Sequence, residues 1–206
     1  MSTEFHRATS VPPPPESAIA NAYASMHLAD AYSIELPNGA STNPERLARF
    51  IFAHQAPWIN TLTAVRDALV AGFGLKTAKH LASLQAQSGA DRLGIFRIYS
   101  TSSTEVLLGE DDKHLDFRLS VLCSGESSPG AKRHLILSTV VHCHNRFGRL
   151  YLFLIAPFHR VVVQSSLRSA ARVGWPSGDG DEEGDTSRTP SPMRPRRLGA
   201  AAHVKR

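Results

Sequence analysis

The sequence predicts an α+β domain in which a curved antiparallel sheet wraps around a long C-terminal helix, with two helices after the first strand. Apolar residues recur at helical spacing over residues 44–73 and again over 157–173, whereas between residues 94 and 155 their period is two. The segments with this periodicity are contiguous and come to about 145 residues, near the usual size of one domain. We therefore expect a single domain over residues 30–175.

Both ends of the chain have compositions that are typical of disorder. The tetraproline Pro12–Pro15 favours an extended conformation that cannot enter a helix or a central strand. After Pro176 the chain is rich in Gly, Ser, Asp, Glu and then Arg, with few large apolar residues to offset the entropy of ordering. We expect a disordered proline-rich arm over residues 1–29 and a disordered tail over residues 176–206, and deletion of residues 1–25 or 177–206 should leave folding intact.

The first half of the domain reads as a strand and two helices. Residues 31–36 form a short apolar run that ends at Pro37, as a strand would. Asn43 can cap a helix that has Pro44 in its first turn and that ends before Pro57. A second helix follows over residues 59–73, with its end marked by two glycines.

The second half reads as a run of strands before the terminal helix. Strands are expected over residues 95–100, 105–108, 114–123, 134–144 and 149–155, the last two forming a hairpin around residues 145–148. Pro157 stands where a proline in the first turn of a helix would, and apolar residues then recur as far as Gly174. This order of elements is that of the helix-grip, or START-like, architecture.

A curved sheet with a helix across its concave face encloses either side chains or a cavity. The expected strand Leu150–Leu154 is apolar on both faces, which predicts that both are covered. The terminal helix would cover one face, and a second subunit could cover the other. A homo-oligomer is therefore possible.

Charge and composition indicate which classes of partner the protein lacks. The formal net charge is +5, but the basic residues of the last twenty positions follow an acidic patch over residues 179–185, so no basic face is evident and no nucleic-acid partner is expected. The first residues are polar and proline-rich, unlike a secretory signal, and no apolar run approaches a membrane span, so we expect a cytoplasmic protein without a membrane partner. Cys123 and Cys143 fall in apolar strands and read as buried thiols.

The strand over residues 114–123 carries the first candidate site. His114, Asp116 and Arg118 alternate with apolar residues and share one face. They could be the solvated side of the strand, with Asp116 and Arg118 paired. They could instead line a pocket, where His114 and Asp116 exchange protons with a ligand and Arg118 holds an anion.

Three further histidines are candidates. His142 and His144 lie two apart in a strand and so share a face, which suits either a metal site or ordinary hydrogen bonds at the end of a hairpin. That spacing alone is weak evidence, and we expect neither a metal nor a cofactor. His159, in the first turn of the expected terminal helix, could contact a ligand or form an ion pair with the acidic residues 110–112.

Three separated segments carry a family resemblance: GEDDKHLDFR (residues 109–118), HCHNRFGRLY (142–151) and PFHR (157–160). Together they resemble the signature of a bacterial domain-of-unknown-function family whose members are similar to START-like proteins of the polyketide-cyclase type. Some members are fused behind a domain similar to short-chain dehydrogenases, but this chain lacks the Gly-x-Gly-x-x-Gly motif of such a domain. The resemblance covers about residues 30–173 and implies a fold but no activity.

We therefore expect a binding module for a small apolar or amphipathic molecule, possibly with an acidic group, held in a pocket between the sheet and the terminal helix. The expected site residues are His114, Asp116, Arg118, His142, His144 and His159. Two alternatives stay open. One is a cyclase- or hydrolase-type enzyme that uses His114, Asp116 and Arg118, and the other is a structural subunit that assembles through residues 150–155.

Overall fold

The computed structural model describes residues 7–71, 92–125 and 132–178. Its elements in chain order are β1 (Thr9–Val11), the 3-10 helix η2 (Ala18–Asn21), β2 (Leu28–Leu36), α1 (Pro44–Ala53), α2 (Pro57–Ala71), β3 (Arg92–Leu93), β4 (Phe96–Thr101), β5 (Glu105–Asp111), β6 (Leu115–Ser124), β7 (Arg133–Cys143) and α4 (Arg146–Val173).

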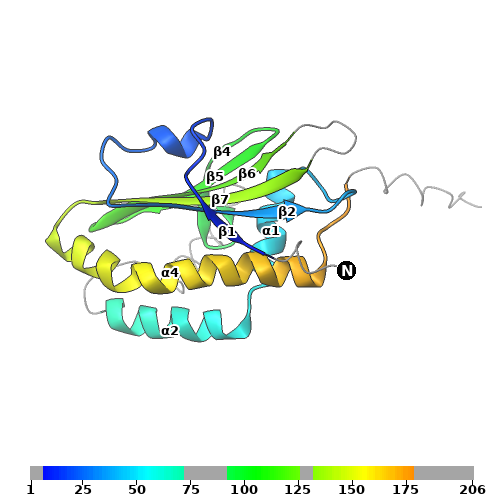
Figure 1. Ribbon diagram of the computed structural model, residues 1–206. Helices are drawn as coiled ribbons and strands as arrows, with labels where there is room; N and C mark the ends of the chain where they lie inside the picture. Colours follow the sequence, from blue (N-terminus) through cyan, green and yellow to red (C-terminus); the bar gives the residue numbers. More distant parts are fainter. Residues whose placement is uncertain (1–6, 72–91, 126–131, 179–206) are drawn as a thin grey trace, which may run out of the picture.

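The strands form one curved antiparallel sheet in the order β1-β2-β7-β6-β5-β4-β3 (Figure 1). Helices α1 and α4 contact one face of this sheet, which we call the inner face, and η2 contacts β6 and β7 from the other, the outer face. Because side chains alternate along a strand, neighbouring residues of β6 or β7 belong to different faces. The predicted α+β class, with two helices after a first long strand and a long C-terminal helix, is confirmed.

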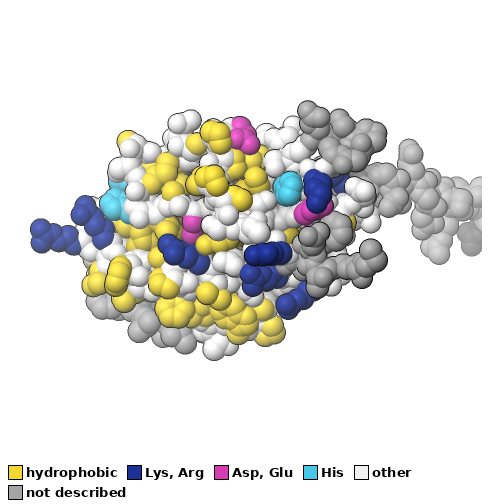
Figure 2. All heavy atoms as spheres, viewed as in Figure 1, with side chains coloured by type: hydrophobic (Ala, Val, Ile, Leu, Met, Phe, Trp, Pro, Cys, Tyr) yellow, Lys and Arg dark blue, Asp and Glu magenta, His cyan; other side chains and the backbone are white. Residues whose placement is uncertain are grey.

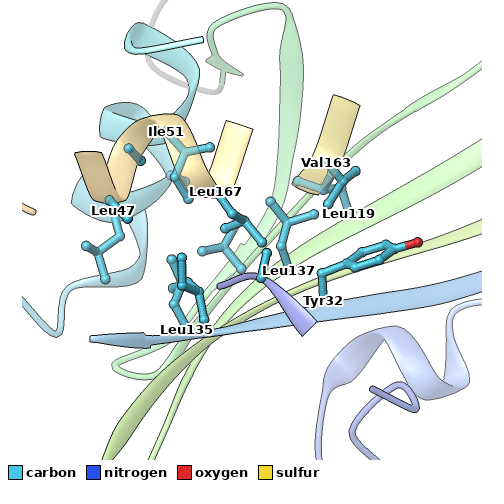
Figure 3. Close-up of a cluster of buried hydrophobic side chains, with 14 of the residues drawn as sticks. Tyr32, Leu47, Ile51, Leu119, Leu135, Leu137, Val163 and Leu167 are labelled. Atoms are coloured by element: carbon cyan, nitrogen blue, oxygen red, sulfur yellow. The ribbon is translucent and has the colours of Figure 1, made fainter. Parts of the chain in front are cut away.

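The hydrophobic core lies between the inner face and the two helices (Figure 3). Leu119, Leu135 and Leu137 of the sheet meet Leu47 and Ile51 of α1, and α4 adds the residues Val163 and Leu167. Helix α1 begins as predicted, because the Asn43 side chain accepts a hydrogen bond of 2.9 Å from the Arg46 amide. This capping fixes where the helix starts and which of its residues reach the sheet.

The predicted hairpin over residues 134–144 and 149–155 is wrong in its second half. Residues 149–155 belong to α4, which starts at Arg146 after the Asn145 side chain accepts a hydrogen bond of 2.9 Å from the Gly148 amide. An uninterrupted apolar run suits a buried strand and a helix equally well, so periodicity could not separate them. Pro157 consequently lies inside the helix rather than at its start.

Gly148 is a site of close approach instead of a turn. A Cβ atom at this position would lie 2.2 Å from the His114 carbonyl oxygen, so only glycine lets α4 begin this near to β6. The first turns of α4 are thereby held beside His114, at the start of β6.

The outward side of α4 carries a stripe of exposed apolar side chains. Leu150, Phe153, Leu154, Phe158 and Val161 follow each other at helical spacing, and Phe153 is 76% exposed. Figure 2 shows hydrophobic side chains gathered on the side of the molecule that α4 and α2 occupy. By length and composition α4 could cross a membrane, and 22% of its apolar segment is buried in this fold. The expectation that no segment reaches that length is therefore wrong.

Residues 7–29 of the N-terminal arm fold onto the sheet, contrary to the disorder predicted for residues 1–29. Strand β1 pairs with β2, and Ile19 of η2 is 0% exposed against the outer face. Only a few apolar residues are needed here, because each fills a defined place on the sheet. At the other end, residues 175–178 also contact the domain: Trp175 packs on Phe50, and the Ser41 amide donates to the Pro176 carbonyl at 2.7 Å. The remainder of the predicted tail lies outside the described residues.

Candidate functional site

A cavity of about 270 Å³ lies between the inner face of the sheet and helices α1 and α4. Most of its wall is aromatic or aliphatic and comes from strands and helices alike, including the residues Phe52, Phe96, Phe117, Leu119, Leu137 and Leu152. The strands contribute every second residue, as the alternation requires. The wall thus offers an apolar ligand extensive contact and few polar partners.

The polar part of the wall includes Thr139 of β7 and two residues of α4, His159 and Ser166. Thr139 and Ser166 are buried, and neither hydroxyl has a hydrogen-bond partner among the described residues. Asp30 stands directly opposite Thr139 in the β2–β7 pairing, and its Oδ1 lies 3.3 Å from His159 Nε2. We call Asp30, Thr139, His159 and Ser166 the polar corner.

The described cavity wall offers a bound anion neither Lys nor Arg. Glu110 and Asp112 both contribute to the wall, and no described residue of the wall is Lys or Arg. Glu110 forms an ion pair of 2.6 Å with Arg92, whose side chain is 7% exposed, behind the wall. A bound anion would therefore lack a Lys or Arg partner in the cavity.

Of the six predicted site residues, His159 alone lines this cavity. It pairs with Asp30, not with the acidic residues 110–112 that the sequence suggested. Asp116, Arg118 and His142 alternate with cavity residues on β6 and β7 and so lie on the outer face. The His114 side chain lies at the start of α4, where its Nδ1 is 3.0 Å from the Asn145 side-chain nitrogen and its ring is tilted against that of Phe147.

Arg118 is held in a cluster of its own on the outer face. Its guanidinium lies 3.6 Å from the centre of the Tyr99 ring and 5.4 Å from that of Tyr23, and it donates a hydrogen bond of 2.7 Å to Asp111. Burial and the hydrogen bond to Asp111 raise the pKa of Tyr99 to about 12. These contacts make Arg118 a structural residue that joins β4, β5 and the N-terminal arm, not an anion ligand of the cavity.

His142 and His144 share a face, as predicted, with ring centres 5.3 Å apart. His144 pairs with Asp116 at 3.0 Å, and His142 Nδ1 lies 2.8 Å from the Ser25 carbonyl of the arm. Within the part of the chain that the structure describes, no three His, Cys, Asp or Glu side chains are placed to hold a metal ion. The two histidines connect the arm to the sheet.

We expect His27 to make the attachment of this arm sensitive to pH. Its Nδ1 accepts a hydrogen bond of 3.1 Å from the Cys143 amide, which only a neutral ring can do. Partial desolvation, with the positive charges of Arg149 and His142, lowers the pKa of His27. A lowered pKa in the folded state means that stability is present above the ordinary value of about 6.5 and is lost as the pH falls below it.

We expect the thermal midpoint of the wild type to fall more on acidification from pH ~7.5 to ~5.5 than that of His27→Asn. Asparagine places an oxygen near the position of Nδ1 and accepts the same hydrogen bond without titrating. Melting curves of both proteins at the two pH values measure the difference. Equal losses would show that His27 does not contribute to the pH dependence.

The two cysteines are free thiols, as predicted. Cys143 is buried, and burial raises the pKa of the partly buried Cys123 to about 11. A thiol that stays protonated at neutral pH is a poor nucleophile. Both cysteines are therefore packing residues.

Sequence reasoning missed Asp30, Thr139 and Ser166. A signal was present, since each is a single polar residue at a position where the pattern of its strand or helix calls for an apolar one. Thr139 lies between Leu137 and Val141 on the inner face, and Ser166 follows His159 by two helical turns. Isolated polar residues in an apolar pattern would therefore have been better markers of the cavity than the cluster of polar residues on β6.

Comparison with known proteins gives one match. Residues 22–166 match the model of a family described as "Protein of unknown function (DUF2867)". No curated protein and no solved structure matches the chain. The matched region runs from the outer-face segment of the arm to Ser166 and so contains all four residues of the polar corner.

Proposed function

We propose that this chain, which belongs to the DUF2867 family, binds a small, mostly apolar molecule between its sheet and α4. The observation that supports the proposal is the cavity of about 270 Å³ whose wall is mostly apolar and also holds the unpartnered hydroxyls of Thr139 and Ser166. Ligand sites in proteins are typically concave, mostly apolar and of roughly 300 to 1,000 Å³, so this cavity suits a ligand near the small end of that range. A START-like, helix-grip fold, in which sheet and helix enclose such a ligand, is part of the same proposal.

The core around the cavity is well formed, because Leu137 and Val163 are nearly completely buried next to it. A ligand placed there would make close dispersion contacts with the aromatic and aliphatic side chains of the wall.

Neither alternative has comparable support. The residues of the proposed cyclase- or hydrolase-type enzyme lie away from the cavity: Asp116 and Arg118 are on the outer face, and His114 is beside Asn145. A homo-oligomer through residues 150–155 is still a proposal, with the exposed stripe of α4 in place of a strand as the contact surface. That surface is compatible with ligand binding, because the cavity uses the opposite side of α4.

Two adjacent residues of α4 provide a direct test. Ile155 contributes to the cavity wall, and Leu154 is exposed on the opposite side of the helix. We expect Ile155→Trp to fill the cavity and to weaken binding of the neutral fluorescent probe N-phenylnaphthylamine at least tenfold, because the ring occupies the volume that the probe needs. Leu154→Trp adds the same side chain outside the cavity and should leave the affinity unchanged.

Saturable binding of one probe per chain in the wild type, lost in Ile155→Trp and kept in Leu154→Trp, would support the proposal. The thermal midpoint of each variant verifies that both still fold. If the wild type shows no saturable binding, or if the two variants lose it equally, the cavity is not a ligand site.

A further inference from the structure

We infer that the cavity selects an apolar molecule that carries an uncharged hydroxyl group, and that this group binds at the polar corner. The inference rests on the proposed function and adds the chemical class of the ligand. It departs from the acidic group that the sequence suggested, because Arg118, on which that suggestion depended, lies on the other side of the sheet.

Three unpartnered polar atoms in the polar corner support the inference. The Thr139 and Ser166 hydroxyls and the second carboxylate oxygen of Asp30 are buried, and none has a partner among the described residues. Leaving a buried polar atom without a hydrogen bond is unfavourable, and such atoms in proteins are normally satisfied by protein, water or ligand. Thr139 and Ser166 both contribute to the cavity wall, so a ligand group in the cavity can reach either hydroxyl.

The electrostatics of the cavity disfavour a carboxylate. Asp112 contributes to the wall together with Glu110, whose charge is balanced by Arg92, and Asp30 pairs with His159 next to it. A carboxylate placed among these groups would lose its hydration without gaining a Lys or Arg, since the described wall has neither. An uncharged polar group loses less hydration on entering the cavity and needs no cationic partner there.

A hydroxyl fits better than a carbonyl because of the groups that it would meet beside β2 and β7. Asp30 stands opposite Thr139 in the β2–β7 pairing, and its Oδ2 is buried without a partner among the described residues. A carboxylate oxygen can only accept a hydrogen bond, whereas the Thr139 hydroxyl can donate and accept. A ligand hydroxyl can donate to Asp30 and accept from Thr139, whereas a carbonyl can only accept.

The first experiment compares three ligands that share one ring system: naphthalene, naphthol and naphthoic acid, which is ionised at neutral pH. Their affinities for the wild type can be measured by displacement of N-phenylnaphthylamine. We expect naphthol to bind about five- to tenfold more tightly than naphthalene, as one or two hydrogen bonds would give, and naphthoate to bind more weakly than either.

The second experiment uses two neighbouring residues of β7. Thr139→Val keeps the shape of the side chain and removes the inner-face hydroxyl, and Ser138→Ala removes a hydroxyl that is equally buried and unpartnered on the outer face. We expect Thr139→Val to lose most of the preference for naphthol over naphthalene, while Ser138→Ala keeps it. Thr139→Val should also melt a few degrees higher without ligand, because it removes a polar atom that lacks a partner.

The outcomes separate this inference from the proposed function. If none of the three ligands displaces the probe, or if the probe itself does not bind, the proposed function fails. If naphthalene binds and naphthol has no advantage, or if the advantage survives in Thr139→Val, the cavity binds apolar molecules but the hydroxyl inference is wrong. Tighter binding of naphthoate would likewise overturn it.

Discussion

Replacing Ile19 by Ala should destabilise the domain by about 3 kcal/mol, the usual range for removing most of a fully buried aliphatic side chain. Ile19 is held against the outer face by η2, whose N-cap residue Ser17 and first residue Ala18 are anchored by hydrogen bonds to the Glu105 carboxylate. The thermal midpoint should fall by roughly 6 to 12 °C in a domain of this size. Differential scanning calorimetry measures both quantities.

Val173→Ala is the control, because it shortens an aliphatic side chain that is exposed at the end of α4. Such a surface change is usually worth less than about 0.5 kcal/mol. Deletion of residues 1–25 should be at least as destabilising as Ile19→Ala, although composition alone predicted no effect. A midpoint of Ile19→Ala within a degree or so of the control would mean that the arm does not dock in solution.

The Glu110–Arg92 pair is the second place where a single substitution should have a large effect. Both side chains are at most 10% exposed, and Arg92 Nη2 donates to Glu110 and to the Ile95 carbonyl at 2.6 Å each. Glu110→Ala leaves the buried guanidinium without its counter-charge, which should destabilise the domain by about 3 to 5 kcal/mol. Urea denaturation of the variant gives the value.

The adjacent residue provides a matched control. Asp111 also pairs with an arginine, at 2.7 Å from Arg118, but its side chain is 51% exposed on the outer face. Asp111→Ala should therefore lower the free energy of unfolding by no more than about 1 kcal/mol. The double variant Arg92→Met, Glu110→Leu should recover most of the stability, because it leaves no unpaired charge. Equal losses at positions 110 and 111 would contradict the difference in burial on which the prediction depends.

Much of the fold could be read from local patterns. The Asn43–Pro44 pair marked the start of α1, and the alternation over residues 114–123 gave β6 almost to the residue. The errors arose where a local pattern fits two structures. A continuous apolar run over residues 150–155 suits a strand or a helix. The tetraproline predicted an extended, disordered arm, although Ile19, a few residues further on, is buried.

The site was predicted less well than the fold, because side chains alternate between the two faces of β6 and the polar ones were assigned to the wrong face. His114, Asp116 and Arg118 were expected to line a pocket under the terminal helix, yet the apolar partners Leu115, Phe117 and Leu119 are the ones that face a helix-covered core. The polar residues of β6 therefore lie on the face of the sheet that is opposite the cavity. What no local pattern could supply is that Asp30 and His159, 129 positions apart, meet across the inner face.

The two faces of the sheet also bear on how this family can change over time. The cavity residues Phe117 and Thr139 alternate along their strands with Arg118 and Ser138, which serve the outer face and the arm. Groups that share no partner contribute to stability almost additively, so a substitution in the cavity needs no compensating change beneath the arm. The sheet thus keeps the cavity wall and the attachment of the arm on separate sets of positions, so the wall can change in sequence while the contacts of the arm stay as they are.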